Sequence, residues 1–366
     1  MREITISKRE EGQRLFRFLE KYLPGASSGF LHKMLRKKNI KINDGRAQGK
    51  EILCQGDRIQ IYFSEETLQK FTASPKTREE RKGDSPLKEQ KLQGKPAGRG
   101  VRVLYQDDDV ILFHKPAGIL TQRDDRGEES MNDLLIDYCL SQSIISREDL
   151  EIFRPSVANR LDRNTSGILL AGISVAGLQA LSRLLREKRT EKYYICPVEG
   201  RMEGKGTLTG YLIKDRKRNR VRLSDRPREG GSPVETRYEV LDSKDQASLL
   251  RVQLLTGKSH QIRAHMASLG HPVLGDPKYG SRDLNRTIKK ELGIDCQLLH
   301  SYEIRFPVWD DTGDLPYGDM GDPERRVQKN LSGLCITDPI PSKMAEVLRH
   351  YGLDSGRQSS KRGVLK

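Results

Sequence analysis

The stretch "NRLDRNTSG", residues 159–167, sets one carboxylate, Asp162, between Arg160 and Arg163 and follows it with a Thr-Ser-Gly turn. A carboxylate beside cations should stay charged at neutral pH, because nearby positive charge favours that form. In a cleft such a group can act as a nucleophile, a general base or an electrostatic stabiliser. The alternative is a structural ion pair where a strand meets a helix.

A second stretch, "LLTGKSHQIRAH" (254–265), favours the catalytic interpretation. It predicts a strand, a glycine turn and the start of a helix, and its Arg263 could reach the carboxylate from across a site. His260, His265 and His271 suggest a metal, but no acidic ligand stands at a familiar spacing. The face of a basic helix explains these histidines better, and we expect no metal.

The composition favours a polyanionic partner. The 366 residues allow two or three domains, and 66 Lys and Arg against 51 Asp and Glu give a net charge of +15. Nucleic acid is the first expectation, an anionic membrane the second, and a soluble basic protein without such a partner the alternative. No apolar run approaches the roughly 20 residues of a membrane span. The five cysteines are scattered without a CxxC pair, which argues against a zinc site and for a reducing cytosol. We expect a cytoplasmic protein that binds no membrane, and we expect it to be a monomer.

Residues 1–63 predict a compact α/β unit of two helices followed by small strands. Apolar residues at 15, 18, 19 and 22 form one helix face, which ends at Pro24-Gly25. Ser27 or Ser28 can cap a second helix. That helix leads into a basic run made of Lys33, Arg36, Lys37 and Lys38. A solvated helix face is the usual interpretation, but few acids balance the run, so a surface that contacts RNA phosphates is equally well supported.

The remaining chain divides into three parts. Residues 64–100 are rich in Lys, Glu, Gly and Pro and predict a flexible basic linker that lets two domains move independently. Residues 101–310 predict an α+β domain, with a mixed, mostly antiparallel sheet flanked by helices. One helix should be capped by Ser174, and another should open at Ser259. Residues 311–366 form an extension to which the sequence assigns no role.

These stretches together resemble the RluA family of RNA pseudouridine synthases over most of residues 101–310. "VILFHKPAGIL" is similar to the family's first motif, a strand that runs into Lys-Pro-x-Gly. "RLDRNTSGILLAG" matches the signature whose aspartate is catalytic, "KYYICPVEG" resembles its tyrosine strand, and "TGKSHQIRAH" its Thr-Gly-Arg-x-His-Gln-Ile-Arg motif. Residues 1–63 are similar to the S-four-like RNA-binding domain that precedes the catalytic body in several branches.

The resemblance implies an isomerase that breaks the uracil N1–C1′ bond, turns the base and joins C5 to C1′, without cofactor or metal. It makes Asp162 the catalytic carboxylate, which either attacks C1′ or removes the C2′ proton. Arg263 would hold Asp162, with a planar fork suited to bidentate pairing. Tyr194 would stack on the uracil and could take the C5 proton, while strand alternation sends Tyr193 to the other face.

Other residues near the motifs have weaker assignments. Arg160 would fill the space left by the flipped uridine or grip a phosphate, and a structural bond to a backbone carbonyl is the alternative. Lys115 is expected to be a turn residue near the cleft, and Asp276 to fix the "GDPKYG" turn. Asn159 and Lys258 depart from the His and Arg that are usual in the family, and Asn159 could alter the substrate preference.

Large-subunit ribosomal RNA is the first expected substrate, because family members with this N-terminal domain usually act on it. Transfer RNA is the second. A non-catalytic ribosome-assembly factor would keep the fold without the chemistry. A nucleoside hydrolase or glycosylase would also use a carboxylate at the glycosidic carbon, but it would release the base.

Overall fold

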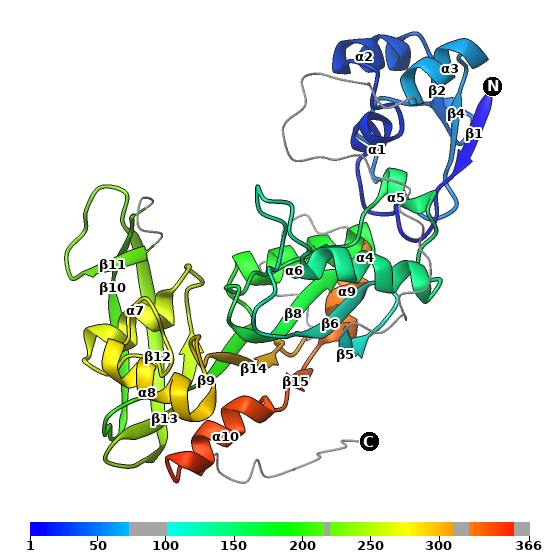
Figure 1. Ribbon diagram of the computed structural model, residues 1–366. Helices are drawn as coiled ribbons and strands as arrows, with labels where there is room; N and C mark the ends of the chain where they lie inside the picture. The colour runs from blue at the N-terminus through cyan, green and yellow to red at the C-terminus, as the bar shows by residue number, and fades with distance from the viewer. Residues whose placement is uncertain (73–100, 216–219, 310–321, 355–366) are drawn as a thin grey trace.

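The computed structural model describes residues 1–72, 101–215, 220–309 and 322–354. Two sheets organise these residues (Figure 1). A four-stranded sheet with the order β1-β4-β2-β3 belongs to the N-terminal unit. A sheet with the order β11-β10-β12-β13-β9-β14-β8-β6-β5 forms the larger body, with β15 added to β14 and β7 to β8.

The N-terminal unit packs helices against its small sheet. Its strands are β1 (Arg2–Thr5), β2 (Ile40–Ile42), β3 (Gly45–Arg46) and β4 (Arg58–Ile61), and its first helices are α1 (Leu15–Tyr22) and α2 (Ser28–Arg36). Ser27 caps α2 by accepting a hydrogen bond from the Phe30 amide at 3.2 Å. The two predicted helices are therefore confirmed, with Ser27 as the cap of the second.

The N-terminal unit extends beyond the predicted boundary at residue 63. Helix α3 (Glu65–Thr72) buries Leu68 against the same core, and the Phe71 ring packs on Phe30 with their centroids 4.7 Å apart. These apolar contacts outweigh the polar composition that indicated a linker from residue 64. The rest of that expected linker, 73–100, lies outside the described residues.

The larger sheet is mixed and mostly antiparallel, as predicted. One half contains β5 (Arg102–Gln106), β6 (Val110–Lys115), β7 (Ser156–Val157) and β8 (Ser166–Gly172). The other contains β9 (Glu191–Glu199), β10 (Lys205–Asp215), β11 (Arg220–Ser224), β12 (Ser232–Ser243) and β13 (Ala247–Leu254). Strand β14 (His300–Arg305) joins the halves, parallel to β8 and antiparallel to β9.

Helices cover both faces of the first half of the large sheet. Alternate residues of β6 enter two separate cores: Ile111 and Phe113 pack with α4 (Met131–Ser141), while Val110 and Leu112 pack with α6 (Val175–Arg186). A strand buried on both faces explains why this segment reads as a continuous apolar run. The expected cap of α6 is present, since Ser174 accepts a hydrogen bond from the Gly177 amide at 2.9 Å. The other helices of residues 101–309 are α5 (Asp149–Ile152), α7 (Gln261–Ser268) and α8 (Arg282–Leu292).

The described part of the C-terminal extension belongs to the body. Helix α9 (Asp322–Leu331) buries Val327 and Leu331 in the core that α6 shares, and β15 (Cys335–Thr337) pairs with β14. Helix α10 (Ser342–His350) follows and buries Met344, Val347 and Leu348. The larger body therefore continues past the boundary expected at residue 310, at least to residue 354.

The N-terminal unit is docked on the body by charged contacts. Arg326 of α9 lies 2.7 Å from Glu11 and 3.2 Å from the buried Asp109. Arg9 forms an ion pair with Asp149 at 2.9 Å, and its carbonyl accepts the Val175 amide at 3.0 Å. These contacts join the small unit to the body (Figure 1), and the independent motion expected from a tether stays a prediction.

Candidate active site

Asp162 lies on the loop between β7 and β8, at the wall of a cavity of about 1150 Å³. Thr121 holds this loop just before Asp162: its Oγ1 donates to the Leu161 carbonyl at 2.8 Å and accepts from the Leu161 amide at 3.2 Å. The carboxylate therefore starts from an anchored backbone, which is what a preorganised site requires.

Lys115 also holds the loop that carries Asp162. Its buried Nζ donates to the carbonyls of Pro116, Arg163 and Thr165 at 3.0, 2.7 and 2.9 Å. Burial lowers the pKa of Lys115 to about 7, against the opposing charge of Asp162. The expectation of a simple turn residue near the cleft is therefore wrong, because Lys115 connects β6 to the loop that carries Asp162.

The end of this loop needs a glycine. Gly167 has a φ of +118°, and a Cβ atom built on it would lie 2.2 Å from the Ser301 carbonyl oxygen. Because β14 passes so close, any side chain at this position would force the two strands apart. The Thr-Ser-Gly turn is therefore part of the contact between β8 and β14.

Arg263 reaches Asp162 from helix α7, about a hundred residues further along the chain. Its Nη1 lies 3.3 Å from Asp162 Oδ2. The guanidinium fork, however, is used by Asp276, whose oxygens lie 2.6 Å from Nε and 2.8 Å from Nη2. The expected bidentate pairing with Asp162 is therefore wrong. Asp276 fixes its turn, as expected, by accepting the Lys278 and Tyr279 amides, and it also orients Arg263.

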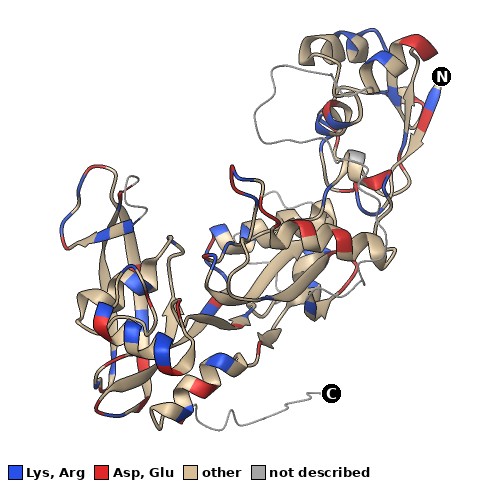
Figure 2. Ribbon diagram, in the orientation of Figure 1, with Lys and Arg blue, Asp and Glu red and all other residues tan. Residues whose placement is uncertain are grey.

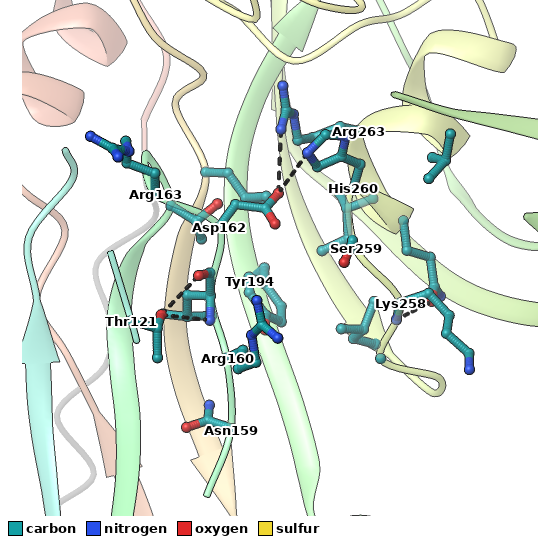
Figure 3. A pocket seen from close by; sticks show the side chains of 18 of the residues that line it. Thr121, Asn159, Arg160, Asp162, Arg163, Tyr194, Lys258, Ser259, His260 and Arg263 are labelled. Atoms are coloured by element: carbon teal, nitrogen blue, oxygen red, sulfur yellow. Dashed lines mark hydrogen bonds and ion pairs between the residues drawn. The ribbon is translucent and has the colours of Figure 1, made fainter. Parts of the chain in front are cut away.

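The arginines beside Asp162 in sequence are not its partners. Arg163 turns away and pairs with Glu128 at 2.8 Å (Figure 3). Arg160 is exposed and lines the cavity, and within the described ranges it forms no ion pair and no bond to a backbone carbonyl. The structural alternative for Arg160 thus finds no support, and its guanidinium is available to a ligand.

Tyr194 of β9 lines the cavity and is only 6% exposed. Tyr193 points to the other face, as strand alternation predicts, with the Arg251 guanidinium 3.9 Å from its ring centroid. Burial raises the pKa of Tyr194 to about 12, and the charge of Asp162 acts in the same direction. The phenol therefore keeps its proton at neutral pH, which suits stacking and donation.

His260 is the site residue that the sequence assigned to a basic helix face. It is the N-cap of α7 and has a φ of +56°, so the helix begins at Gln261 and is not opened by Ser259. The His260 Nε2 lies 3.8 Å from Asp162 Oδ2, and Figure 3 shows His260 and Arg263 reaching that oxygen together. The left-handed backbone of His260 places its ring near Asp162, and no pattern in the sequence predicts this conformation.

Basic side chains surround the cavity opening. The positively charged residues of the lining include Arg160, Arg186, Lys188, Lys192, Lys214, Arg220 and Lys258. Figure 2 shows further Lys and Arg along the β10–β11 pair. Such a basic lining favours a polyanion over a neutral ligand. Asn159, by contrast, uses its side chain structurally, because its Oδ1 accepts the Leu170 amide at 2.8 Å.

The second predicted basic surface is separate from the cavity. All four of its residues are exposed and, within the described ranges, free of ion pairs; they are Lys33, Arg36, Lys37 and Lys38. They lie at the C-terminal end of α2, which is far from α7 (Figure 1). The structure therefore brings Asp162, Tyr194 and Arg263 to one cavity with Arg160, and it leaves the α2 surface on another part of the molecule.

Metal ligands and membrane helices are both missing from the described residues. In residues 1–72, 101–215, 220–309 and 322–354, no three His, Cys, Asp or Glu side chains gather in a way that could hold a metal ion. None of the helices in these ranges has the length and apolar character needed to cross a membrane.

Comparison with known proteins gives one consistent family. The sequence model described as RNA pseudouridylate synthase matches residues 109–268. The ribosomal large subunit pseudouridine synthase C of Haemophilus influenzae is 31% identical over 309 residues, which cover 83% of this chain and 86% of that protein. The protein of the same name from Escherichia coli K12 is 29% identical and covers 83% and 88%.

A solved structure shares the fold. The human RNA pseudouridylate synthase domain containing 4 superposes with a TM-score of 0.52 at 19% identity, over 69% of this chain and 93% of that one. The family motifs occur on the elements around Asp162, and the relatives cover most of the chain. The protein therefore belongs to the RluA family of RNA pseudouridine synthases, isomerases that convert uridine to pseudouridine in RNA.

Proposed function

We propose that this enzyme isomerises one or more uridines of large-subunit ribosomal RNA, with Asp162 as its catalytic carboxylate. The observation that carries the proposal is the contact of Asp162 with Arg263 inside a basic cavity that Tyr194 also lines. The names of the relatives from Haemophilus influenzae and Escherichia coli support the choice of RNA.

In the proposed reaction, the target uridine leaves its stack and enters the cavity, which costs a few kcal/mol of unstacking. Asp162 then attacks C1′ or removes the C2′ proton, and in either case the N1–C1′ bond breaks. The detached uracil stays in the cavity and turns until C5 faces C1′. Tyr194, which keeps its proton, stacks on the base, so its loss should impair the turning step more than the binding of RNA.

Arg263 contributes a fixed positive charge beside Asp162. Because Asp276 holds the guanidinium on the side away from the cavity, Arg263 needs no reorganisation when RNA arrives. Arg160, exposed and unpaired within the described ranges, would contact a phosphate or fill the gap left by the flipped nucleotide.

In this proposal the N-terminal unit provides a second surface that contacts RNA. Residues 1–72 would act as the S-four-like RNA-binding domain, with the basic surface of α2 contacting phosphates. Residues 101–354 would form the catalytic domain. Contacts such as the ion pair of Arg9 with Asp149 join the N-terminal unit to the catalytic domain. One RNA molecule that touches both would have to span the distance from α2 to the cavity.

The test is carbodiimide mapping of pseudouridine in total RNA from the parent strain, a deletion strain, and deletion strains complemented with wild-type protein, Asp162→Asn or Asp125→Asn. Asp125 is exposed, so its variant makes the same charge change as a matched control. We expect sites in large-subunit RNA that disappear on deletion and return with wild type and Asp125→Asn, but not with Asp162→Asn. Restoration by Asp162→Asn would remove its catalytic role, and lost sites confined to transfer RNA would overturn the proposed substrate.

The same proposal has the enzyme act in the cytoplasm as a monomer, without metal or cofactor. Activity of the purified protein should survive exhaustive treatment with EDTA, and light scattering should give a mass near 41.7 kDa. Loss of activity that returns on addition of a metal, or a stable mass of twice that value, would refute the corresponding part.

A further inference from the structure

Two side-chain nitrogens face one oxygen of Asp162, Arg263 Nη1 within hydrogen-bond distance and His260 Nε2 just beyond it. Arg263 Nη1 lies 3.3 Å from Oδ2, and His260 Nε2 lies 3.8 Å from the same atom. Within the described ranges no hydrogen bond or ion pair involves Oδ1. Oδ2 is thus held by Arg263 with His260 close to it, and Oδ1 is left for a substrate in the cavity.

The proton on His260 is placed by Tyr279. The Tyr279 hydroxyl accepts the Val221 amide at 2.8 Å, so its own proton must go to another acceptor. His260 Nδ1 lies 3.0 Å from that hydroxyl, closer than the Val221 carbonyl at 3.4 Å. We assign the hydroxyl proton to the nearer acceptor, Nδ1, and this tautomer places the ring proton of neutral His260 on Nε2, which faces Asp162.

The backbone is constrained to bring His260 to this place. A φ of +56° is uncommon outside glycine and is held here by the next residue. Gln261 donates to the Glu235 carbonyl at 3.0 Å and to Thr236 Oγ1 at 2.9 Å, which fixes the start of α7 on β12. His260 therefore has a left-handed backbone, lies directly before the buried Gln261 anchor and faces the Asp162 carboxylate. This arrangement is specific to the site and is not explained by a solvated basic helix face.

The ring stays uncharged in this environment. Burial lowers the pKa of His260 to about 4; Arg263 and Lys278 act in the same direction, and Asp162 opposes them. At neutral pH His260 can therefore donate to Asp162 without adding a second full positive charge to the site. A neutral donor complements the charge of Arg263.

We infer that His260 is a positioning residue for the isomerisation: when a uridine fills the cavity, its Nε2–H closes the 3.8 Å gap to Oδ2 of Asp162, which Arg263 already holds, so that Oδ1 is presented to the ribose. The inference rests on the proposed catalytic role of Asp162. Tyr279 takes part by selecting the tautomer of His260, and its hydroxyl joins His260 to the backbone of β11 through two hydrogen bonds.

Two substitutions at His260 separate this role from a structural one. Glutamine places an amide nitrogen near the position of Nε2, whereas asparagine reaches only the position of Nδ1. Asparagine, however, tolerates the left-handed backbone better than glutamine. If His260 positions Asp162, His260→Gln should keep kcat within about 10-fold of wild type, and His260→Asn should lose about 100-fold, the cost of a misplaced reacting group. If His260 only supports the backbone, the order is reversed.

A variant at Tyr279 provides a second measurement. Tyr279→Phe should lower kcat by about 10-fold in the wild-type background, because His260 loses the partner that selects its tautomer. The same change should cost nothing further in His260→Gln, whose amide has no tautomer to select. This non-additivity is a signature of coupling that two independent structural defects would not show.

Single-turnover kinetics on ribosomal RNA purified from the deletion strain would give these values, with RNA affinity and thermal unfolding measured in parallel. We expect KM and the unfolding temperature to change little in His260→Asn while kcat falls. Equal kcat in wild type, His260→Asn and Tyr279→Phe, or a more active His260→Asn than His260→Gln, would overturn the inference. An inactive Asp162→Asn beside such a result would leave the proposed function standing, whereas an active one would remove the proposed role of Asp162 itself.

Discussion

Arg263 and Asp276 form a buried bidentate pair, with Nε and Nη2 of the arginine 2.6 and 2.8 Å from the two carboxylate oxygens. The pair is formed on the side of the guanidinium that faces away from the cavity, and Nη1 is left for Asp162. Two acids therefore share one arginine, and the buried acid decides where the arginine points. The contact with Asp162 exists before any substrate binds.

Asp276→Asn should destabilise the protein strongly. Removing one charge of a buried pair typically costs about 3–5 kcal/mol, because the remaining charge loses its compensation. We expect urea denaturation to show a lower midpoint with an unchanged slope. Asp283→Asn is the matched control, since its side chain is 92% exposed and its loss should change the free energy of unfolding by less than about 0.5 kcal/mol. Equal midpoints for the two variants would contradict the structural weight given to Asp276.

Arg263→Lys should lower kcat by about 100-fold, because a single ammonium group cannot reproduce the planar fork on Asp276 and still reach Asp162. RNA affinity should be nearly unchanged, since Arg263 is only 3% exposed. Binding and single-turnover assays on ribosomal RNA from the deletion strain separate these effects. Arg286→Lys, on the exposed face of α8, is the control and should match wild type. A fall in affinity as large as the fall in kcat would place Arg263 in the binding surface.

The α2 surface should carry part of the salt dependence of RNA binding. Replacing Lys33 and Lys37 by glutamine removes two charges, and each RNA phosphate that is no longer neutralised should reduce the slope of log K against log salt by about one. The same change at Lys289 and Lys290 of α8 is a control of equal charge, and it should leave the slope closer to that of wild type. Identical slopes for the two double variants would exclude α2 from the RNA interface.

Acid should destabilise the fold through His265. Its side chain is fully buried with Nδ1 2.8 Å from Thr236 Oγ1, and burial lowers its pKa from the ordinary 6.5 to about 4. Between about pH 6.5 and pH 4, His265 is therefore protonated in the unfolded chain and neutral in the folded chain. The free energy of unfolding therefore loses nothing through His265 above about pH 6.5, and it decreases as the pH falls from there to about 4.

Denaturation midpoints of wild type and His265→Gln at pH 7 and pH 5 test this assignment. The variant should be less stable at pH 7 but should lose less stability on acidification. His260, whose pKa is shifted in the same direction, contributes equally to both proteins. Parallel losses in the two proteins would show that other groups dominate the acid response.

The sequence predicted the parts of the site that short motifs define. Asp162 and Arg263 are far apart in the chain, yet both occur in recognisable stretches, and the structure brings them into contact. The directions in which Arg160 and Arg163 point were not predictable in the same way. Consecutive residues of an irregular loop point in different directions, so closeness in sequence says little about contact, and Arg163 finds Glu128 instead.

The errors at the domain boundaries have a different physical cause. Leu68, Phe71, Val327 and Leu331 stand in segments dominated by charged residues, and averaged composition hides a few apolar residues on one helix face. What they pack against lies far away in the sequence. The position of His260 was hidden for a related reason: its backbone conformation is set by anchors on β12, not by its immediate neighbours.

Strand β14 lies between β8 and β9 in the sheet, although it follows both in the chain. The loop before β8 carries Asp162, and β9 carries Tyr194. A ribosome makes the two halves of this sheet first and the strand that joins them afterwards. A nascent chain that has not yet emerged as far as residue 305 cannot assemble the cavity. The enzyme therefore cannot become active before β14 has been synthesised, well after the two strands that it joins.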